Sequence, residues 1–287
     1  MKIAAAAYPL DFLENWAAYE AKLTRWVADA AGQGAELLVF PEYAAMELAS
    51  LGGRAVAADL ERSLVQVSGL AGQAAALHDR LARRCGVWIV AASGPVFAGD
   101  RPVNRAALFG PEGPLGHQDK QIMTRFEREE WNVVPGGPLR LFETSSVAAG
   151  VTICYDSEFP LLARHLCEAG AKLILVPSCT EQQAGYHRVR IGAMARALEN
   201  QCISVLAPVI GDAGWCPGVE AGHGAAAIFG PPDIGFPATG IIAEGGVNRP
   251  GWVIAEVDFA AVDAVRAEGR VLNHRHWGEQ DARIISR

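Results

Sequence analysis

Short apolar runs rich in β-branched residues alternate with longer segments of helical spacing along this chain. In its first half we predict strands at 3–7, 37–40 and 87–92, and helices at about 13–31 and 70–84. Residues 104–109 and the segment before Lys120 are typical of two strands joined by a Gly-Pro-Glu-Gly-Pro turn. A pattern in which strands and helices alternate predicts the α/β class.

The second half repeats this alternation. The predicted strands lie at 147–154, 173–176, 202–206, 225–229 and 252–257, and the predicted helices at 159–169 and about 186–200. In the last of these helices Ile191, Met194, Ala195 and Leu198 recur at helical spacing and form one apolar face. The Gly- and Pro-rich stretch 230–251 is expected to be a long surface loop. We find no internal repeat and no linker, and therefore predict a single domain over residues 1–287.

Composition and charge narrow the class of protein. Apolar residues make up 51% of the 287 residues and charged residues 20%, which excludes a disordered chain. The net charge of −7 argues against a nucleic-acid partner or an anionic membrane surface. Lysine is scarce, with four residues against 21 arginines.

Cysteine usage and the start of the chain bear on the compartment. The six cysteines contain no C-x-x-C pair and several lie inside apolar runs, as in reduced intracellular proteins. Pro9, Asp11 and Glu14 interrupt the first apolar stretch too early for a signal peptide, and no run approaches the length of a membrane span. We therefore expect a cytoplasmic protein.

Two short motifs carry little weight. Residues 222–227 fit the G-x-G-x-x-A dinucleotide pattern, but they run into a predicted strand instead of opening a helix. His274 and His276 have no further ligand at metal-binding spacing, which favours a surface or subunit-contact role. The sequence also contains no G-x-S-x-G motif of a serine hydrolase. We accordingly expect neither a metal nor another cofactor.

Cys154 lies where a buried strand ends and a helix follows shortly after. Asp156 or Ser157 is placed to cap that helix, and Pro160 falls in its first turn. A helix N-terminus favours the thiolate, and its free N–H groups can receive an oxyanion. The alternative is a small buried apolar side chain. We favour that alternative for the other five cysteines: Cys85, Cys167, Cys179, Cys202 and Cys216.

Glu42 and Lys120 occupy similar positions at strand ends. Glu42 directly follows an apolar strand, where α/β proteins place active-site residues, and Lys120 ends another predicted strand. Taken alone, Glu42 would be an ordinary loop residue and Lys120 a solvated charge. In a chain that uses arginine almost everywhere, however, the retained Lys120 is harder to dismiss as a solvated charge.

Together these residues resemble the nitrilase superfamily of carbon–nitrogen hydrolases, over nearly the whole chain. The motifs that carry the resemblance are the apolar run into Pro41-Glu42, Lys120 followed by Phe126-Glu127-Arg128 and Pro135-Gly136, Ile153-Cys154-Tyr155-Asp156 with Glu158-Phe159-Pro160, residues 170–178, and Arg196-Ala197-x-Glu199-Asn200. The Asp156 that follows Cys154-Tyr155 is closer to amidase-like branches than to true nitrilases, so the resemblance favours an amide over a nitrile.

The resemblance implies a Glu–Lys–Cys mechanism. Glu42 would act as general base on Cys154, whose sulfur attacks the carbon of an amide or a nitrile. Lys120 and the backbone N–H of Tyr155 would stabilise the oxyanion, each donor contributing roughly 3–4 kcal/mol. Glu42 would then protonate the departing ammonia and activate a water that hydrolyses the thioester. Glu127 matches a second glutamate of the family, expected to position Lys120 or the substrate.

Other site residues follow from the same resemblance. Glu129 and Glu130 are alternatives to Glu127. The pocket candidates are Tyr43, Tyr155, Thr180 and His187. Glu158, Arg190 and Arg196 could bind a substrate carboxylate, although for Arg196 we favour a structural ion pair.

The implied fold is a four-layer α-β-β-α sandwich, which commonly dimerises, so a homodimer or higher homo-oligomer is expected. The first functional hypothesis is a hydrolase that converts a small carboxamide to an acid and ammonia. A nitrilase or N-carbamoyl amidohydrolase would use the same residues. A non-catalytic binding or assembly member of the fold is the third hypothesis, and the intact Glu42, Lys120 and Cys154 argue against it.

Overall fold

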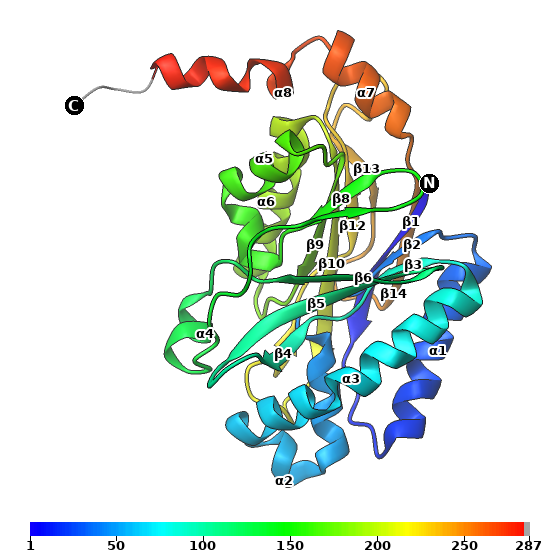
Figure 1. The fold of residues 1–287 in the computed structure, drawn as a ribbon, viewed down its shortest axis with the longest axis vertical. Helices are drawn as coiled ribbons and strands as arrows, with labels where there is room; N and C mark the ends of the chain where they lie inside the picture. Colours follow the sequence, from blue (N-terminus) through cyan, green and yellow to red (C-terminus); the bar gives the residue numbers. More distant parts are fainter. Residues whose placement is uncertain (284–287) are drawn as a thin grey trace.

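The computed structural model describes residues 1–283, so the last four residues of the expected domain span lie outside the described part. Two curled β-sheets face each other at the centre of the molecule, and helices cover their outer faces (Figure 1). The chain therefore has the expected mixed α/β architecture in four layers, α-β-β-α.

The first sheet is built mainly from the N-terminal half. Its strands are β1 (Lys2–Pro9), β2 (Leu37–Val39), β3 (Trp88–Val90), β4 (Gly94–Phe97), β5 (Pro102–Gly110), β6 (Gly113–Asp119) and β14 (Gly251–Glu256). Strands β1, β2 and β3 are parallel, and β14 pairs antiparallel with β1. Strand β5 pairs antiparallel with β3, β4 and β6.

The second sheet is built from the later part of the chain. Its strands are β7 (Leu141–Glu143), β8 (Ala148–Val151), β9 (Leu173–Ser178), β10 (Ile203–Asp212), β11 (Ala221–Gly222), β12 (Ala227–Phe229) and β13 (Ile241–Glu244). Strands β8, β9 and β10 are parallel. The last two residues of β1, Tyr8 and Pro9, pair with Val209 and Ile210 of β10, so the two sheets are joined at one end.

Helices form the outer layers. They are α1 (Trp16–Gly32), η1 (Ala44–Gly52), α2 (Arg54–Ala57), α3 (Leu60–Cys85), α4 (Arg125–Glu129), η2 (Cys154–Glu158), α5 (Pro160–Glu168), α6 (Gln183–Asn200), α7 (Phe259–Glu268), α8 (Asn273–His276) and η3 (Trp277–Arg283), where η marks a 3-10 helix. Helices α1 and α3 lie over the first sheet, and α5 and α6 lie together over the second (Figure 1). Across residues 1–283, none of the helices has both the length and the apolar character needed to cross a membrane.

Apolar side chains fill two layers of core. Val39 of the first sheet and Val151 and Leu175 of the second belong to one buried cluster between the sheets. Leu38, which points to the opposite face of β2, packs in a second cluster with Leu64 of α3. A strand that is buried on both faces reads as a continuous apolar run, which is why these strands could be predicted.

Helix α3 differs from the prediction because it begins at Leu60, well before residue 70. Asp59 caps it by accepting a hydrogen bond from the backbone N–H of Arg62. Gly69 and Gly72, which weaken a helical pattern in the sequence, lie inside the helix with no neighbour to crowd a side chain. Gly86 ends it in the left-handed conformation, with φ of 65°.

Helix α6 buries a different face from the one the apolar spacing marks. Ile191 is 64% exposed and Leu198 is 41% exposed. The buried face carries Tyr186, Val189 and Ala193 instead. Two apolar stripes therefore run along this helix, and the sheet covers only one of them.

The stretch 230–251 is not a loop throughout, because residues 241–244 form β13 and pair with β12. The glycine-rich stretch 222–227 enters strand β12 and opens no helix, which confirms the loop-to-strand interpretation.

Candidate active site

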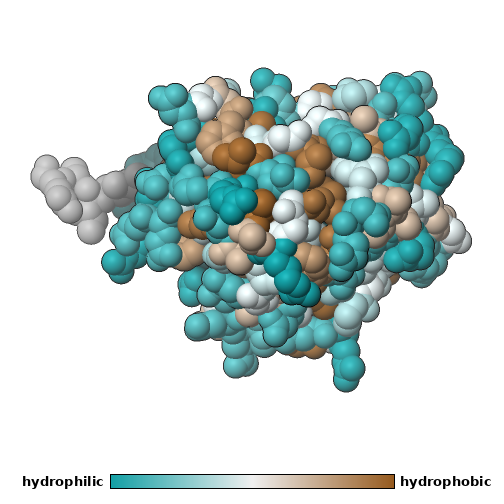
Figure 2. Space-filling model, turned by 90° about the horizontal axis from the view of Figure 1, so that it is seen from below, coloured by the Kyte–Doolittle hydropathy of each residue, from teal (hydrophilic) through white to brown (hydrophobic). Residues whose placement is uncertain are grey.

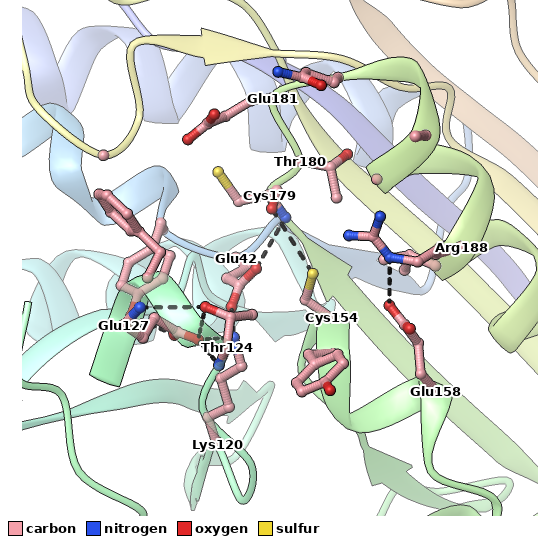
Figure 3. A pocket seen from close by; sticks show the side chains of 18 of the residues that line it. Glu42, Lys120, Thr124, Glu127, Cys154, Glu158, Cys179, Thr180, Glu181 and Arg188 are labelled. Carbon is pink, nitrogen blue, oxygen red and sulfur yellow. Dashed lines mark hydrogen bonds and ion pairs between the residues drawn. The ribbon is translucent and has the colours of Figure 1, made fainter. Parts of the chain in front are cut away.

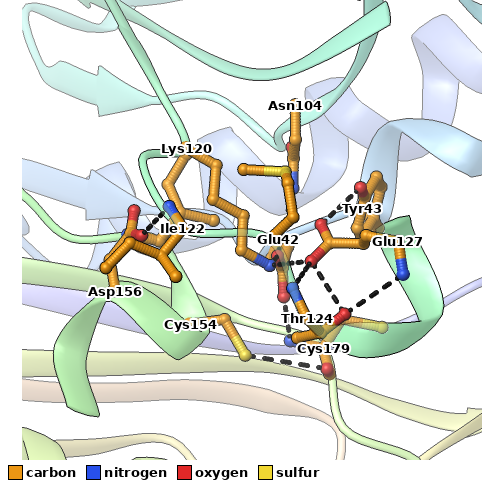
Figure 4. Close-up of polar contacts among 12 residues, drawn as sticks. Glu42, Tyr43, Asn104, Lys120, Ile122, Thr124, Glu127, Cys154, Asp156 and Cys179 are labelled. Atoms are coloured by element: carbon orange, nitrogen blue, oxygen red, sulfur yellow. Dashed lines mark hydrogen bonds and ion pairs between the residues drawn. The ribbon is translucent and has the colours of Figure 1, made fainter. Parts of the chain in front are cut away.

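Three predicted site residues meet near the carboxyl ends of three strands. Glu42 follows β2, Lys120 follows β6 and Cys154 follows β8, and Figure 4 shows their side chains gathered in one site. All three side chains are buried, with between 1% and 4% of each residue exposed. The two sheets thus bring together groups that are far apart in the sequence.

Lys120 lies between two carboxylates. Its Nζ is 2.7 Å from Oε1 of Glu42 and 2.7 Å from Oε2 of Glu127. Burial opposes the positive charge, but the two adjacent carboxylates outweigh it and hold the pKa of Lys120 well above its usual value. Lys120 is therefore a fixed cation.

Glu42 is held by donors on both of its oxygens. Asn104 of β5 donates to Oε1 at 3.0 Å, and the backbone N–H of Cys179 donates to Oε2 at 3.0 Å. Burial, opposed by Lys120 and reinforced by Glu127, raises the pKa of Glu42 to about 7. A carboxyl group with that pKa can both accept and return a proton near neutral pH.

Glu127 lies on the short helix α4, where Thr124 caps the first turn and also donates to the Glu127 carboxylate. The Tyr43 hydroxyl donates to its other oxygen at 2.7 Å. Burial would raise the pKa of Glu127, but the Lys120 charge and these hydrogen bonds outweigh it and lower the pKa. Glu127 is thus a fixed anion that orients Lys120.

The alternatives to Glu127 lie elsewhere. Glu129 pairs with Arg125 on the exposed side of α4, and Glu130 is exposed. Only Glu127 among these three glutamates contacts Lys120.

Cys154 adopts a strained backbone conformation at the start of η2. Its φ of 48° lies in the left-handed region, which few non-glycine residues occupy. The Ser157 hydroxyl donates to the Cys154 carbonyl at 2.6 Å, and the Cys154 Sγ lies 3.8 Å from the Cys179 carbonyl oxygen. These contacts hold the sulfur at the edge of the pocket next to Glu42 (Figure 4).

The expected preformed thiolate is not supported. Burial and the nearby Glu42 carboxylate raise the pKa of the Cys154 thiol well above its usual value. The α-helix whose dipole was expected to lower that pKa begins only at Pro160, and the intervening η2 is a five-residue 3-10 helix. The raised pKa favours the neutral thiol over the thiolate.

Asp156 does not cap the following α-helix as expected, and neither does Ser157. The Asp156 carboxylate instead accepts hydrogen bonds from the backbone N–H groups of Gln121, Ile122 and Ile153. Burial raises the pKa of Asp156 to about 6. Asp156 therefore ties the loop after Lys120 to the loop that carries Cys154. Pro160 does lie in the first turn of α5, as predicted.

A cavity of about 250 Å³ opens in front of these groups (Figure 3). Three of the four pocket candidates, Tyr43, Tyr155 and Thr180, line it. His187 is exposed on α6 and is not among the lining residues. Its neighbour Arg188 lines the cavity instead.

The residues considered for binding a carboxylate separate in the structure. Glu158 lines the cavity, where its Oε1 lies 3.7 Å from Nε of Arg188. Arg190 pairs with Glu244 away from the cavity. Arg196 donates to the Ser157 carbonyl and pairs with Glu199, which is the structural role favoured from the sequence.

Sequence reasoning missed four contributors, namely Asn104, Thr124, Cys179 and Arg188. Asn104 and the Cys179 backbone hold Glu42, and Thr124 holds Glu127. Cys179 and Arg188 also line the cavity. In residues 1–283, no group of three His, Cys, Asp or Glu side chains is arranged to hold a metal ion.

A buried Glu–Lys–Cys set at the strand ends of an α-β-β-α fold defines an enzyme of the nitrilase superfamily. The family model described as carbon-nitrogen hydrolase matches residues 2–267, and the chain belongs to this family.

Known relatives are hydrolases and amidases. Probable hydrolase YhcX of Bacillus subtilis is 35% identical over 68% of this chain and 38% of its own length. Deaminated glutathione amidase of Synechocystis is 29% identical over 85% of this chain and 87% of its own length. The matched part of the chain spans between 38% and 62% of the length of each of the first six curated relatives.

Solved structures support the same fold. The NitN amidase of Nesterenkonia sp. AN1 superposes with a TM-score of 0.70 at 27% identity, covering 96% of this chain and 99% of the amidase. The four-layer fold and the enzyme class expected from the sequence are both confirmed.

Proposed function

We propose that this chain hydrolyses a small carboxamide to a carboxylic acid and ammonia through a thioester on Cys154. The observation that carries the proposal is the placement of Lys120 between Glu42 and Glu127, beside the Cys154 sulfur and at the base of a cavity. A proton acceptor, a fixed cation and a nucleophile in one buried site are the groups that acyl transfer requires.

The first step is addition to the amide carbon. The Cys154 sulfur forms a bond to that carbon while its proton passes to Glu42, and the carbonyl electron pair moves onto oxygen. Because the thiol pKa is raised, proton transfer has to accompany attack, and the Glu42 pKa of about 7 suits it to this task. Lys120 and the backbone N–H of Tyr155 stabilise the oxyanion, each by roughly 3–4 kcal/mol.

The second step expels ammonia. The Glu42 proton moves to the amide nitrogen, the carbon–nitrogen bond breaks, and a thioester on Cys154 remains. Glu42 then accepts a proton from a water that attacks the thioester, and returns it to the Cys154 sulfur as the acid leaves. Lys120 keeps its charge throughout, because both of its carboxylate partners raise its pKa.

An amide substrate is supported by two observations. The chain carries Asp156 after Cys154-Tyr155, and its relatives include amidases. For the Nesterenkonia amidase, one structure is described as a complex with butyramide and another as the product of Michael addition of acrylamide at the active-site cysteine. A cavity of about 250 Å³ fits a comparably small acyl group. Nitriles and N-carbamoyl compounds are the alternatives.

The test uses two cysteines that line the same cavity, Cys154 and Cys179. Ammonia release is measured across a panel of amides, nitriles and ureido acids with wild-type enzyme, Cys154→Ala and Cys179→Ala. We expect amide turnover that Cys154→Ala abolishes while the circular dichroism spectrum stays unchanged, and that Cys179→Ala retains. Full activity of Cys154→Ala would refute the nucleophile, and a panel without turnover would favour a binding role.

We further propose a homodimer in the cytoplasm. Ile191 and Leu198 on α6 and Leu161 on α5 are exposed apolar side chains on neighbouring helices, which a second copy could cover. The six cysteines are all free thiols, as a reducing compartment requires. Light scattering should give the dimer mass for the wild type and a monomer mass for Ile191→Asp. A wild-type monomer would refute the dimer.

A further inference from the structure

The outer part of the active-site cavity carries its own charged groups, separate from the catalytic cluster. Glu158, Glu181 and Arg188 line it beyond Cys154 (Figure 3). Lys120 and Arg188 are the cationic lining residues, against four carboxylates. The inner cluster and the outer group thus each contain two carboxylates and one cation, so the cavity as a whole is negative.

Glu158 is the more buried of the two outer carboxylates. Its side chain is 21% exposed, and burial raises its pKa despite the nearby Arg188. The separation of 3.7 Å from Arg188 is too long for a hydrogen bond. Arg188 is 63% exposed, so solvent weakens its attraction for Glu158. Glu158 is therefore a partly desolvated anion whose one ion-pair partner among the described residues is a largely exposed arginine at 3.7 Å.

Glu181 lies across the cavity from Glu158 (Figure 3). Partial burial raises its pKa, and the charges of Glu220 and Glu130 raise it further. Glu181 therefore adds a second negative charge to the outer lining, opposite Glu158. A wall of that sign repels an anionic ligand and attracts a cation.

We infer that the acyl group of the substrate ends in a positively charged group, such as an ammonium, and that Glu158 receives it. This substrate class rests on the amide hydrolysis proposed above. Glu158 lies four residues after Cys154, at the far end of the five-residue 3-10 helix η2, and both side chains line the same cavity. An amide carbon at Cys154 and a cation at Glu158 are thus separated by a short aliphatic chain.

An anionic acyl group fits less well. Among the residues that the structure describes, Arg188 is the one cation of the outer lining, and it already faces Glu158. A substrate carboxylate that binds Arg188 would have to displace the Glu158 carboxylate, yet both carboxylates would remain close together in the same small cavity. The substrate carboxylate would face Glu181 as well. An incoming ammonium would instead form the close ion pair with Glu158 that Arg188, at 3.7 Å, does not form.

Three amides of similar length test the inference. Values of kcat/KM are measured for δ-aminovaleramide, valeramide and glutaramate, whose chains end in a cation, a methyl group and an anion. We expect the cationic amide to exceed the neutral one by about tenfold, mainly through a lower KM, and the anionic amide to be the poorest. Raising the salt concentration should reduce this spread.

Variants locate the effect. Glu158→Gln should bring the ratio of cationic to neutral kcat/KM close to one, while Arg188→Gln should raise it. Glu244→Gln is the matched control, because Glu244 makes a closer pair with Arg190 on the same helix outside the cavity. That variant should keep the wild-type ratio.

The two proposals fail in different ways. Hydrolysis of all three amides with glutaramate ahead, with no preference, or with the ratio unchanged in Glu158→Gln would overturn the charge assignment and leave amide hydrolysis intact. Superior turnover of zwitterionic L-glutamine over δ-aminovaleramide would also overturn it. Absence of ammonia from every amide would refute the proposed function itself.

Discussion

Residues 1–283 contain two buried lysine–glutamate clusters, one of which borders the cavity that contains Cys154. In the first, Lys22 of α1 pairs with Glu47 of η1, and its Nζ lies 2.7 Å from an Asp11 oxygen and 2.7 Å from the Pro9 carbonyl. In the second, Lys120 pairs with Glu42 and Glu127. Both lysines are almost wholly buried.

The difference lies in what surrounds each cluster. Lys22 joins the end of β1 to α1 and η1, and Tyr8 donates to Glu47, so this cluster fixes secondary-structure elements. Lys120 lies beside Cys154 and lines the cavity. A buried ion pair therefore does not by itself indicate chemistry. The face shown in Figure 2 mixes hydrophobic and hydrophilic side chains.

This comparison corrects one interpretation of the sequence. The scarcity of lysine seemed to single out Lys120 as the place where a compact ammonium is needed. Lys22 is another of the four lysines and is also almost wholly buried, yet it contacts no nucleophile. Rarity therefore does not single out a catalytic lysine, and the catalytic role proposed for Lys120 rests on its neighbours.

The largest effect that separates the clusters should come from Lys120→Met. Loss of this cation removes an oxyanion donor and leaves Glu42 and Glu127 to repel each other, so kcat should fall by roughly 10²–10³-fold or more. Steady-state ammonia release, normalised to folded protein, measures the change. Retention of wild-type kcat would place Lys120 with Lys22 as a structural residue.

Lys22→Met should instead affect stability. Removing one partner of a buried pair leaves Glu47 uncompensated, at a cost of roughly 3–5 kcal/mol in the free energy of unfolding. Urea denaturation followed by circular dichroism measures this loss, and kcat per folded molecule should stay at the wild-type value. A catalytic defect in the folded fraction of Lys22→Met would erase the distinction between the clusters.

Glu127→Gln should have a smaller effect than Lys120→Met. The amide keeps the shape of the side chain but loses the charge that orients Lys120, so kcat should fall by about 10- to 100-fold with little change in KM. The matched substitution Glu129→Gln, on the exposed side of the same helix, should leave kcat unchanged. Equal effects of the two substitutions would remove Glu127 from the site.

The pH dependence gives the smallest effect. Glu42 must be ionised to accept the Cys154 proton, so kcat/KM for a neutral amide should rise with pH through about 7 and then level off. In Asn104→Ala the carboxylate loses a donor, which raises the Glu42 pKa and should move the rise to higher pH. Rates measured in buffers of constant ionic strength test this, and a rate that is already maximal near pH 5 would contradict the role of Glu42.

Much of the site could be predicted because its charged and reactive residues come just after predicted strands. Glu42 and Cys154 come shortly after the apolar strands β2 and β8, and Lys120 comes directly after the more polar strand β6. Their meeting follows from the way the two sheets place the carboxyl ends of these strands together. Glu127 became a candidate only through the family resemblance. Asn104 lies within a strand, where a polar residue gives no local signal of its contact with Glu42.

Other features depend on geometry that spacing does not encode. Cys179 serves Glu42 through its backbone N–H, to which residue type is irrelevant. His187 and Arg188 are neighbours on α6, and one residue turns the side chain by about 100° around a helix, which decides which of them reaches the cavity.

The fold was predicted best where elements are long and buried. Strands β4 and β7 were missed because they are short and contain or adjoin Gly, Pro and polar residues. Helix α7 was missed although Asp258 caps it and Val262 and Val265 recur at helical spacing, a signal that could have been used.

The measurement that tests the central claim most directly is the mass of the enzyme during turnover of a carboxamide. Rapid acid quenching followed by peptide mass spectrometry should find the acyl group of the substrate on the peptide that contains Cys154, with one hydrogen lost from the thiol. The peptide that contains Cys179 should remain unmodified. Ammonia release without acylation of Cys154, or acylation of Cys179 instead, would contradict the assignment of Cys154 as the nucleophile.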